Sequence, residues 1–176
     1  MVAALLVSGP SRAEDVPWRL LILYGQAFLP PDQGFAEVGG LGAGRDFNLG
    51  GRWGLGVEVF PLLRFNETAS FSPRRRLGTT AFAAGFPLSF TAGPREAQWA
   101  VRIEGSIGPF WSGDPVPVHG TRWNFIDEVG PRLLLRLSSG LRLGVGYRFL
   151  HISNGNIRRP NPGLSFHTVV LTLEGR

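Results

Sequence analysis

The chain has 176 residues, of which 43% are hydrophobic and 18% are charged, and it contains no cysteine. This length fits one domain, the hydrophobic content excludes a disordered chain, and the lack of cysteine excludes disulfides and cysteine-ligated metals. The net charge of +5 comes from arginines that are dispersed along the chain, so we expect no nucleic-acid partner.

The N-terminus resembles the end of a secretion signal. An apolar run over residues 2–7 is followed by Ser11-Arg12-Ala13, which fits a small-x-small cleavage site. We therefore predict a truncated signal peptide over residues 1–13 and a single domain over residues 14–176. The alternative is a mildly apolar terminus without a targeting role. No later segment has the roughly 18 consecutive apolar residues that a transmembrane helix needs.

Apolar and polar residues alternate along the rest of the chain with the period of two that is typical of β-strands. The alternating segments cover residues 18–28, 52–59, 98–111, 132–137 and 141–149. The clearest is 98–111, whose odd positions are mostly apolar, with a tryptophan at each end. Turn-rich stretches separate about eight strand-like segments, a spacing that predicts an all-β barrel or sandwich.

The polar faces of these segments favour a membrane barrel over a soluble one. Glycines there leave room for charged side chains inside a narrow barrel, and tryptophans at segment ends are typical of interface girdles. We therefore predict an all-β fold, an eight-stranded antiparallel transmembrane outer-membrane β-barrel with its apolar face in lipid. A soluble sandwich or lipocalin-like barrel stays open, because Pro87 and Leu134 do not fit the alternation. The charges predicted to lie inside are Arg52 with Glu58, Arg102 with Glu104, and Arg136, Arg142 and Arg148.

Candidate chemistry lies near the C-terminus, where His151 and Ser153 continue the apolar parity of the preceding strand. Polar residues at membrane depth are functional candidates, and an imidazole beside a hydroxyl can activate a serine nucleophile. Asn154 and Asn161 follow closely and offer amide donors to an oxyanion. The alternative is that His151 lies at the aqueous rim and has no catalytic role.

Residues 148–154 (Arg-Phe-Leu-His-Ile-Ser-Asn), followed by 160–163 (Pro-Asn-Pro-Gly), resemble the lipid A 3-O-deacylase family of PagL type. The resemblance implies an eight-stranded outer-membrane barrel that removes an ester-linked acyl chain from the 3-position of lipid A. It implies a carboxylic ester hydrolase without a cofactor, with His151 as general base, Ser153 as nucleophile, and Asn154 and Asn161 at the oxyanion hole.

The chain departs from the family pattern at one position. The family places a glutamate two residues after the loop glycine to orient the histidine, whereas this chain has Ser165 there. A hydroxyl accepts a hydrogen bond from the imidazole but does not stabilise the imidazolium by charge. Asp127 shares the outward parity of the preceding strand and is the best substitute, whereas we expect Glu128 to point inward.

The resemblance also implies the partners and the location. The expected partners are lipopolysaccharide and outer-membrane lipid, with Arg158 and Arg159 as candidate phosphate contacts or, equally, solvated loop cations. The short turn at residues 138–140 predicts a periplasmic end, so the site would face the outer leaflet of a Gram-negative outer membrane. The competing hypothesis is a non-catalytic structural or surface-interaction barrel, which Ser165 favours.

Overall fold

A computed structural model of the chain describes residues 17–27, 34–69, 76–93, 97–138 and 140–175. The predicted signal peptide and Phe28 lie outside the described residues. None of the described residues forms a helix long and apolar enough to span a membrane. The nine strands of the described residues are β1 (Trp18–Ala27), β2 (Gly34–Gly50), β3 (Trp53–Ala69), β4 (Arg76–Gly85), β5 (Leu88–Ala92), β6 (Trp99–Val116), β7 (Thr121–Arg136), β8 (Leu141–Ser153) and β9 (Leu164–Gly175).

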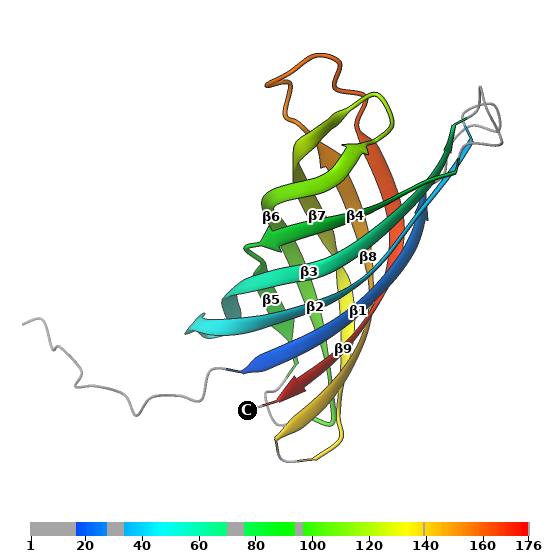
Figure 1. The fold of residues 1–176 in the computed structure, drawn as a ribbon. Helices are drawn as coiled ribbons and strands as arrows, with labels where there is room; N and C mark the ends of the chain where they lie inside the picture. Colours follow the sequence, from blue (N-terminus) through cyan, green and yellow to red (C-terminus); the bar gives the residue numbers. More distant parts are fainter. Residues whose placement is uncertain (1–16, 28–33, 70–75, 94–96, 139, 176) are drawn as a thin grey trace, which may run out of the picture.

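The strands close into an antiparallel ring, with β1 paired to both β2 and β9 (Figure 1). Both β4 and β5 pair with β3 and β6, so together they occupy one of eight places in the ring formed by the described residues. The break between them falls at Phe86 and Pro87, and proline cannot donate to a strand ladder. The predicted eight-stranded ring is therefore confirmed, with one of its strands divided in two.

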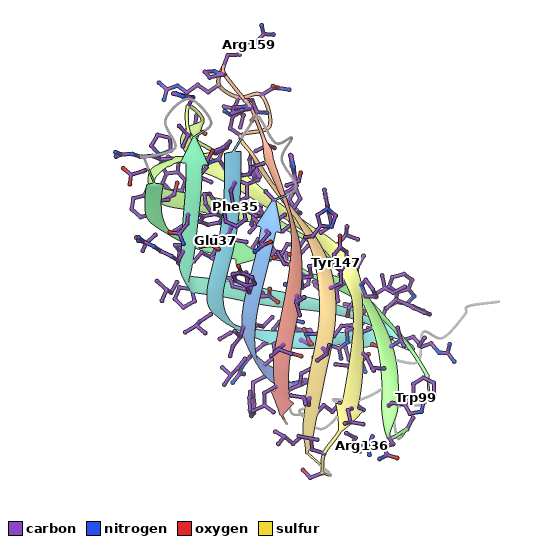
Figure 2. All side chains as sticks on the ribbon, turned by 90° about the vertical axis from the view of Figure 1, so that its right-hand side faces the viewer. Phe35, Glu37, Trp99, Arg136, Tyr147 and Arg159 are labelled. Carbon is purple, nitrogen blue, oxygen red and sulfur yellow. The ribbon has the colours of Figure 1, made fainter. Side chains whose placement is uncertain are left out.

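The two ends of the barrel differ in their connections. We name the end that carries the segments 117–120 and 154–163 the loop end, and the end that carries the turn at 51–52 and the C-terminus the turn end (Figure 1). Trp99 and Arg136 lie toward the turn end and Arg159 at the loop end (Figure 2).

Alternating burial shows which side chains face outward. In β1 the odd positions are buried and the even positions are exposed, and the same alternation runs along β7, β8 and β9 with the matching parity. Apolar side chains such as Ile107 (59% exposed) and Val169 (57%) face outward, as lipid contact requires. The soluble alternative, with its apolar face inward, is therefore wrong. Leu134, which broke the alternation, is buried inside the barrel.

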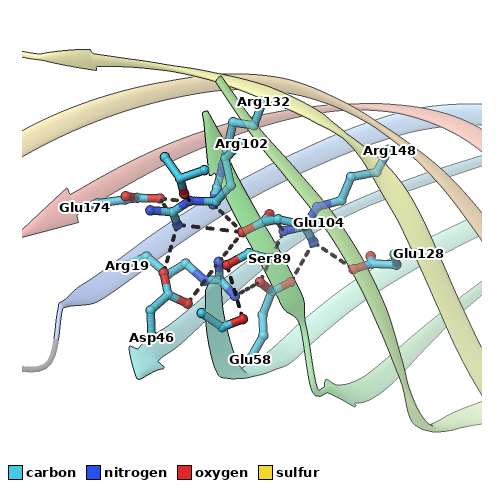
Figure 3. Close-up of polar contacts among 12 residues, drawn as sticks. Arg19, Asp46, Glu58, Ser89, Arg102, Glu104, Glu128, Arg132, Arg148 and Glu174 are labelled. Carbon is cyan, nitrogen blue, oxygen red and sulfur yellow. Dashed lines mark hydrogen bonds and ion pairs between the residues drawn. The ribbon is translucent and has the colours of Figure 1, made fainter. Parts of the chain in front are cut away.

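The interior of the turn half is filled by charged side chains that pair across the barrel (Figure 3). Arg148 contacts Glu58 and Glu128 at 2.7 Å each and Glu104 at 3.2 Å. The expected contact of Arg102 with Glu104 is present at 3.7 Å. The cluster, named here the interior ion cluster, consists of Arg19, Asp46, Glu58, Arg102, Glu104, Glu128, Arg132, Arg148 and Glu174.

The predicted pair of Arg52 with Glu58 is wrong. Arg52 is exposed in the turn between β2 and β3, while Glu58 is fully buried and contacts Arg19 at 2.9 Å as well as Arg148. Shared parity along a segment does not by itself make two charged residues partners. Here Glu58 pairs instead with Arg19 and Arg148, which belong to other strands of the ring.

An apolar core fills the middle of the loop half, with buried polar side chains such as Ser112 and Asn124 near its end. Phe65 packs edge-on against Phe110 and Phe166, with ring centroids 5.4 and 5.8 Å apart. Leu150 and Ile152 of β8 join this core and are fully buried. Because these two residues flank His151 in the chain, the packed core fixes the backbone that carries the candidate site.

Candidate active site

Three neighbouring strands bring Asp127, His151 and Ser165 into one row on the outer face of the barrel. Strand pairing places Asp127 of β7 opposite His151 of β8, and His151 opposite Ser165 of β9. Side chains opposite each other on adjacent strands have Cβ atoms about 4.5–5.5 Å apart. We name these three residues the reactive row; all of them are partly exposed on the outside.

The imidazole of His151 is held by a hydrogen bond between its Nδ1 atom and Ser165 Oγ at 2.8 Å. When Nδ1 of the neutral imidazole carries the proton, Nδ1–H donates the hydrogen bond to Ser165 Oγ, and Nε2 is then unprotonated and able to act as a base. Ser153 lies two residues farther along the same face, opposite Phe125, and within the described part of the chain no hydrogen bond joins it to His151. The Ser–His hydrogen bond of this structure is thus formed by Ser165.

The loop after β8 begins with a tight turn. The backbone N–H of Ile157 donates to the carbonyl of Asn154 at 3.1 Å, and the central residues Gly155 and Asn156 both have positive φ, 61° and 62°. This is the pattern of a type I′ turn, which favours glycine and asparagine.

The two asparagines predicted for the oxyanion hole brace this loop. The backbone N–H of Asn154 donates to Asn161 Oδ1 at 3.0 Å, and Asn154 Nδ2 donates to the carbonyl of Arg158 at 2.8 Å. Asn161 Nδ2 donates to Asn156 Oδ1 across 3.4 Å at an exposed position, which is a long bond. Asn154 is buried, and the partly exposed Asn161 is held beside the start of the loop.

Gly163 fits closely against the imidazole. Its φ is +60°, a left-handed conformation that glycine adopts without steric cost. A Cβ at this position would lie 3.1 Å from Cε1 and 3.5 Å from Nε2 of His151. The loop backbone therefore passes close to the Cε1–Nε2 edge of the ring, and a side chain at position 163 would crowd the imidazole.

Other predicted residues take distinct positions. Asp127 faces outward, and its Oδ1 atom is buried without a hydrogen-bond partner, whereas Glu128 points inward to Arg148, as expected. Arg158 and Arg159 are exposed in the loop. The described residues contain no group of three or more His, Asp or Glu side chains that could hold a metal ion.

Sequence reasoning missed a set of polar side chains on the outer face of β1, β2 and β3. Glu37 accepts hydrogen bonds from Tyr24 and Asn66 there. The sequence analysis identified no alternating segment around Glu37, and the pairing of β1 with β9 was needed to connect this carboxylate to the site.

The chain matches the family model described as lipid A 3-O-deacylase (PagL) over residues 39–174. Among solved structures, the outer membrane enzyme PagL is 16% identical with a TM-score of 0.62, covering 88% of this chain and 97% of that one. Neisserial surface protein A is 11% identical with a TM-score of 0.54, covering 91% of this chain and 94% of that one. OprG from Pseudomonas aeruginosa is 9% identical, also with a TM-score of 0.54, covering 91% of this chain and 95% of that one.

No curated protein sequence matches the chain. At such low identities the solved structures show the fold alone, which is that of an outer-membrane β-barrel. The family match is more specific, because it runs from β2 to β9 and includes the reactive row and the loop after His151. The chain belongs to the lipid A 3-O-deacylase (PagL) family and is a β-barrel protein of the Gram-negative outer membrane.

Proposed function

We propose that this protein hydrolyses the ester that links an acyl chain to the 3-position of lipid A, using His151 as general base and Ser153 as nucleophile, without a cofactor. The observation that carries the proposal is the 2.8 Å contact between His151 Nδ1 and Ser165 Oγ. This contact holds an imidazole on the outer face of the barrel, where an ester in the outer leaflet reaches it directly from the membrane.

The reaction proceeds through an acyl-enzyme. Ser153 Oγ attacks the ester carbonyl carbon while His151 Nε2 takes the hydroxyl proton, and the 3-oxygen of the sugar leaves with that proton. Water then attacks the acyl-serine and gives a proton to Nε2, and His151 passes a proton to Ser153 Oγ as the bond to the acyl carbon breaks and the fatty acid is released. Hydrogen bonds between a catalytic nucleophile and its base are often long before substrate binds. In this proposal, rotation of the Ser153 side chain brings its hydroxyl to His151 Nε2.

The loop after β8 supplies the oxyanion donor in this proposal. Asn161 Nδ2 makes one long, exposed hydrogen bond and has a second hydrogen to donate. The N–H of Asn154 holds the Asn161 side chain in place through its Oδ1 atom. Arg158 and Arg159 lie on the same loop, where their guanidinium groups match the geometry of lipid A phosphates.

Ser165 and Asp127 share the role that a single glutamate has elsewhere in the family. The Ser165 hydroxyl fixes the tautomer of His151, and the Asp127 carboxylate provides negative charge from the opposite neighbouring strand. Asp127 Oδ1 has no competing hydrogen-bond partner, so it is available to the imidazolium that forms during the reaction.

Mass spectrometry of lipid A after incubation with the detergent-folded protein tests the proposal. We expect the wild type to remove one hydroxyacyl chain, Ser165→Ala to do so more slowly, and Ser153→Ala to be inactive. Loss of activity in Ser165→Ala with activity kept in Ser153→Ala would show that Ser165 is the nucleophile instead.

A second candidate function is a non-catalytic barrel. Two observations favour it: Ser153 makes no hydrogen bond to His151 within the described residues, and Ser165 replaces the acid. A folded wild type that leaves several lipid A types intact would select this alternative.

A further inference from the structure

A second polar row runs across the outer face next to the reactive row. Strand pairing aligns His167 of β9, Gln26 of β1, Glu37 of β2 and Asn66 of β3 opposite one another. His167 is two residues from Ser165 on the same strand face, a step of about 7 Å. We name these four residues, with the adjoining Tyr24 and Tyr147, the outer polar row.

The members of the row hold one another in place. Tyr24 Oη donates to Glu37 Oε2 at 3.1 Å, and Asn66 Nδ2 donates to Glu37 Oε1 at 2.8 Å. Gln26 Nε2 donates to Tyr24 Oη at 3.0 Å, and Tyr147 Oη lies 2.6 Å from His167 Nδ1. Glu37 and Tyr147 lie on the same face of the barrel, with β1 and β9 between them (Figure 2). The side chains are therefore ordered before any ligand arrives.

A membrane-interface girdle does not account for this row. Girdles consist of aromatic rings, whereas Glu37 places a carboxylate on a surface where charge is costly. Among the described residues, its hydrogen-bond donors are the neutral groups of Tyr24 and Asn66, and no arginine forms an ion pair with it. Toward the turn end, β1, β2 and β9 next expose apolar side chains such as Ile22, Leu41 and Leu171, whereas β3 exposes Arg64.

The chemistry of the row selects its ligand. Each oxygen of Glu37 accepts one hydrogen bond and has a further acceptor site, which suits the hydroxyl and amide N–H groups of a sugar. Glu37 forms no ion pair among the described residues, and its negative charge disfavours a phosphate at this part of the row. The four aligned residues span three strand spacings, about 14–15 Å, which provides room for a substituted disaccharide.

We propose that the outer polar row binds the sugar headgroup of the acylated substrate through its hydroxyl and amide groups rather than through its phosphates. The inference rests on the proposed function, because it places the scissile ester at the His151 end of the row. The acyl chains then lie over the apolar outer positions below, and Glu37 is a binding residue that distinguishes a glycolipid from other lipids.

Native mass spectrometry of the Ser153→Ala protein in detergent tests the binding, with lipid A and phosphatidylglycerol as the two probes. Glu37→Gln should weaken lipid A binding roughly tenfold or more, since hydrogen bonds to charged groups are the stronger ones, and should leave phosphatidylglycerol unchanged. Tyr24→Phe, which keeps the ring, should cause a smaller loss in the same direction. Asp114→Asn removes one exposed carboxylate elsewhere in the loop half and is the matched control, with no expected change.

Hydrolysis assays distinguish a failure of the sugar-binding site from a failure of the proposed esterase function. In the protein that retains Ser153, Glu37→Gln should raise KM for lipid A with a much smaller change in kcat, whereas Asp114→Asn should leave both constants unchanged. Equal lipid A binding by Glu37→Gln and Asp114→Asn, or a loss in Glu37→Gln that falls on kcat alone, would overturn the inference. If lipid A is not cleaved but its binding still depends on Glu37, the proposed function is wrong and the sugar site remains. Heat-modifiable gel mobility verifies that each variant is folded.

Discussion

Two groups of polar side chains face opposite sides of the barrel wall, and they differ in how their charges are paired. Inside, every charged group of the interior ion cluster has an oppositely charged partner within 4.0 Å, as Arg132 and Glu104 do at 2.6 Å. Outside, neither Asp127 nor Glu37 has a cationic partner among the described residues. Buried charges need partners to be tolerated, so the interior cluster has a structural role, whereas the outer carboxylates remain available to a ligand.

The comparison predicts that activity and stability can be lost separately. His151→Ala should lower lipid A deacylation about a thousandfold or more, as loss of a catalytic histidine does elsewhere, while the urea midpoint of unfolding stays near that of the wild type. His119→Asn is the control, because His119 is exposed in the turn before β7. A large loss of stability in His151→Ala would show that His151, like the interior ion cluster, has a structural role.

The interior should show the opposite behaviour. Arg148→Ala leaves Glu58, Glu104 and Glu128 with fewer cationic partners, and breaking a buried ion pair costs about 3–5 kcal/mol. Equilibrium unfolding in urea measures this loss. Unchanged stability would show that water or protonation compensates the buried carboxylates, and the structural role of the cluster would need revision.

Gly163 tests how closely the loop must approach the imidazole. Gly163→Ala places a Cβ 3.1 Å from His151 Cε1, and a displacement of about 1 Å at a reacting group can lower the rate a hundredfold. We expect a rate loss of at least tenfold in the same assay. Gly155→Ala is the matched control. Gly155 also has a φ of 61°, but a Cβ added there would lie no closer than 3.6 Å to its nearest neighbour, the Phe125 ring. Equal losses in both variants would attribute the effect to backbone strain.

The smallest expected effects concern the missing acid. Asp127→Asn should lower kcat by about tenfold, less than the roughly ten-thousandfold contribution of a hydrogen-bonded triad acid. Ser165→Glu should raise kcat, and in that background Asp127→Asn should matter less, because the glutamate then stabilises the imidazolium. Steady-state kinetics of the wild type, the two single variants and the double variant measure the coupling between positions 127 and 165. Independent effects would exclude a shared role of the two positions.

Alternation in the sequence was sufficient to predict the faces of the strands, because side-chain direction in a strand depends only on parity. It placed His151 and Asp127 on the outside, as the structure shows, and strand pairing puts Ser165 in the same row. It could not predict which charges pair, since Glu58 meets Arg148 across the interior rather than along the chain.

The outer polar row was hidden from the sequence for a related reason. Its members belong to the first and the last strands, and only closure of the ring aligns Gln26 with His167. The division of one strand into β4 and β5 was equally hard to foresee, although Pro87 had already broken the alternation. Local patterns thus predict orientation, whereas register between distant strands requires the structure.

The central claim, that an activated serine lies on the outer face of the barrel, is tested most directly by covalent trapping. A fluorophosphonate with an acyl-like tail is incubated with the folded protein, and the modified peptide is identified by mass spectrometry. The account predicts a single phosphonylated residue, Ser153, and no modification in His151→Ala. Modification of Ser165 instead, or no modification of a folded wild type, would contradict it.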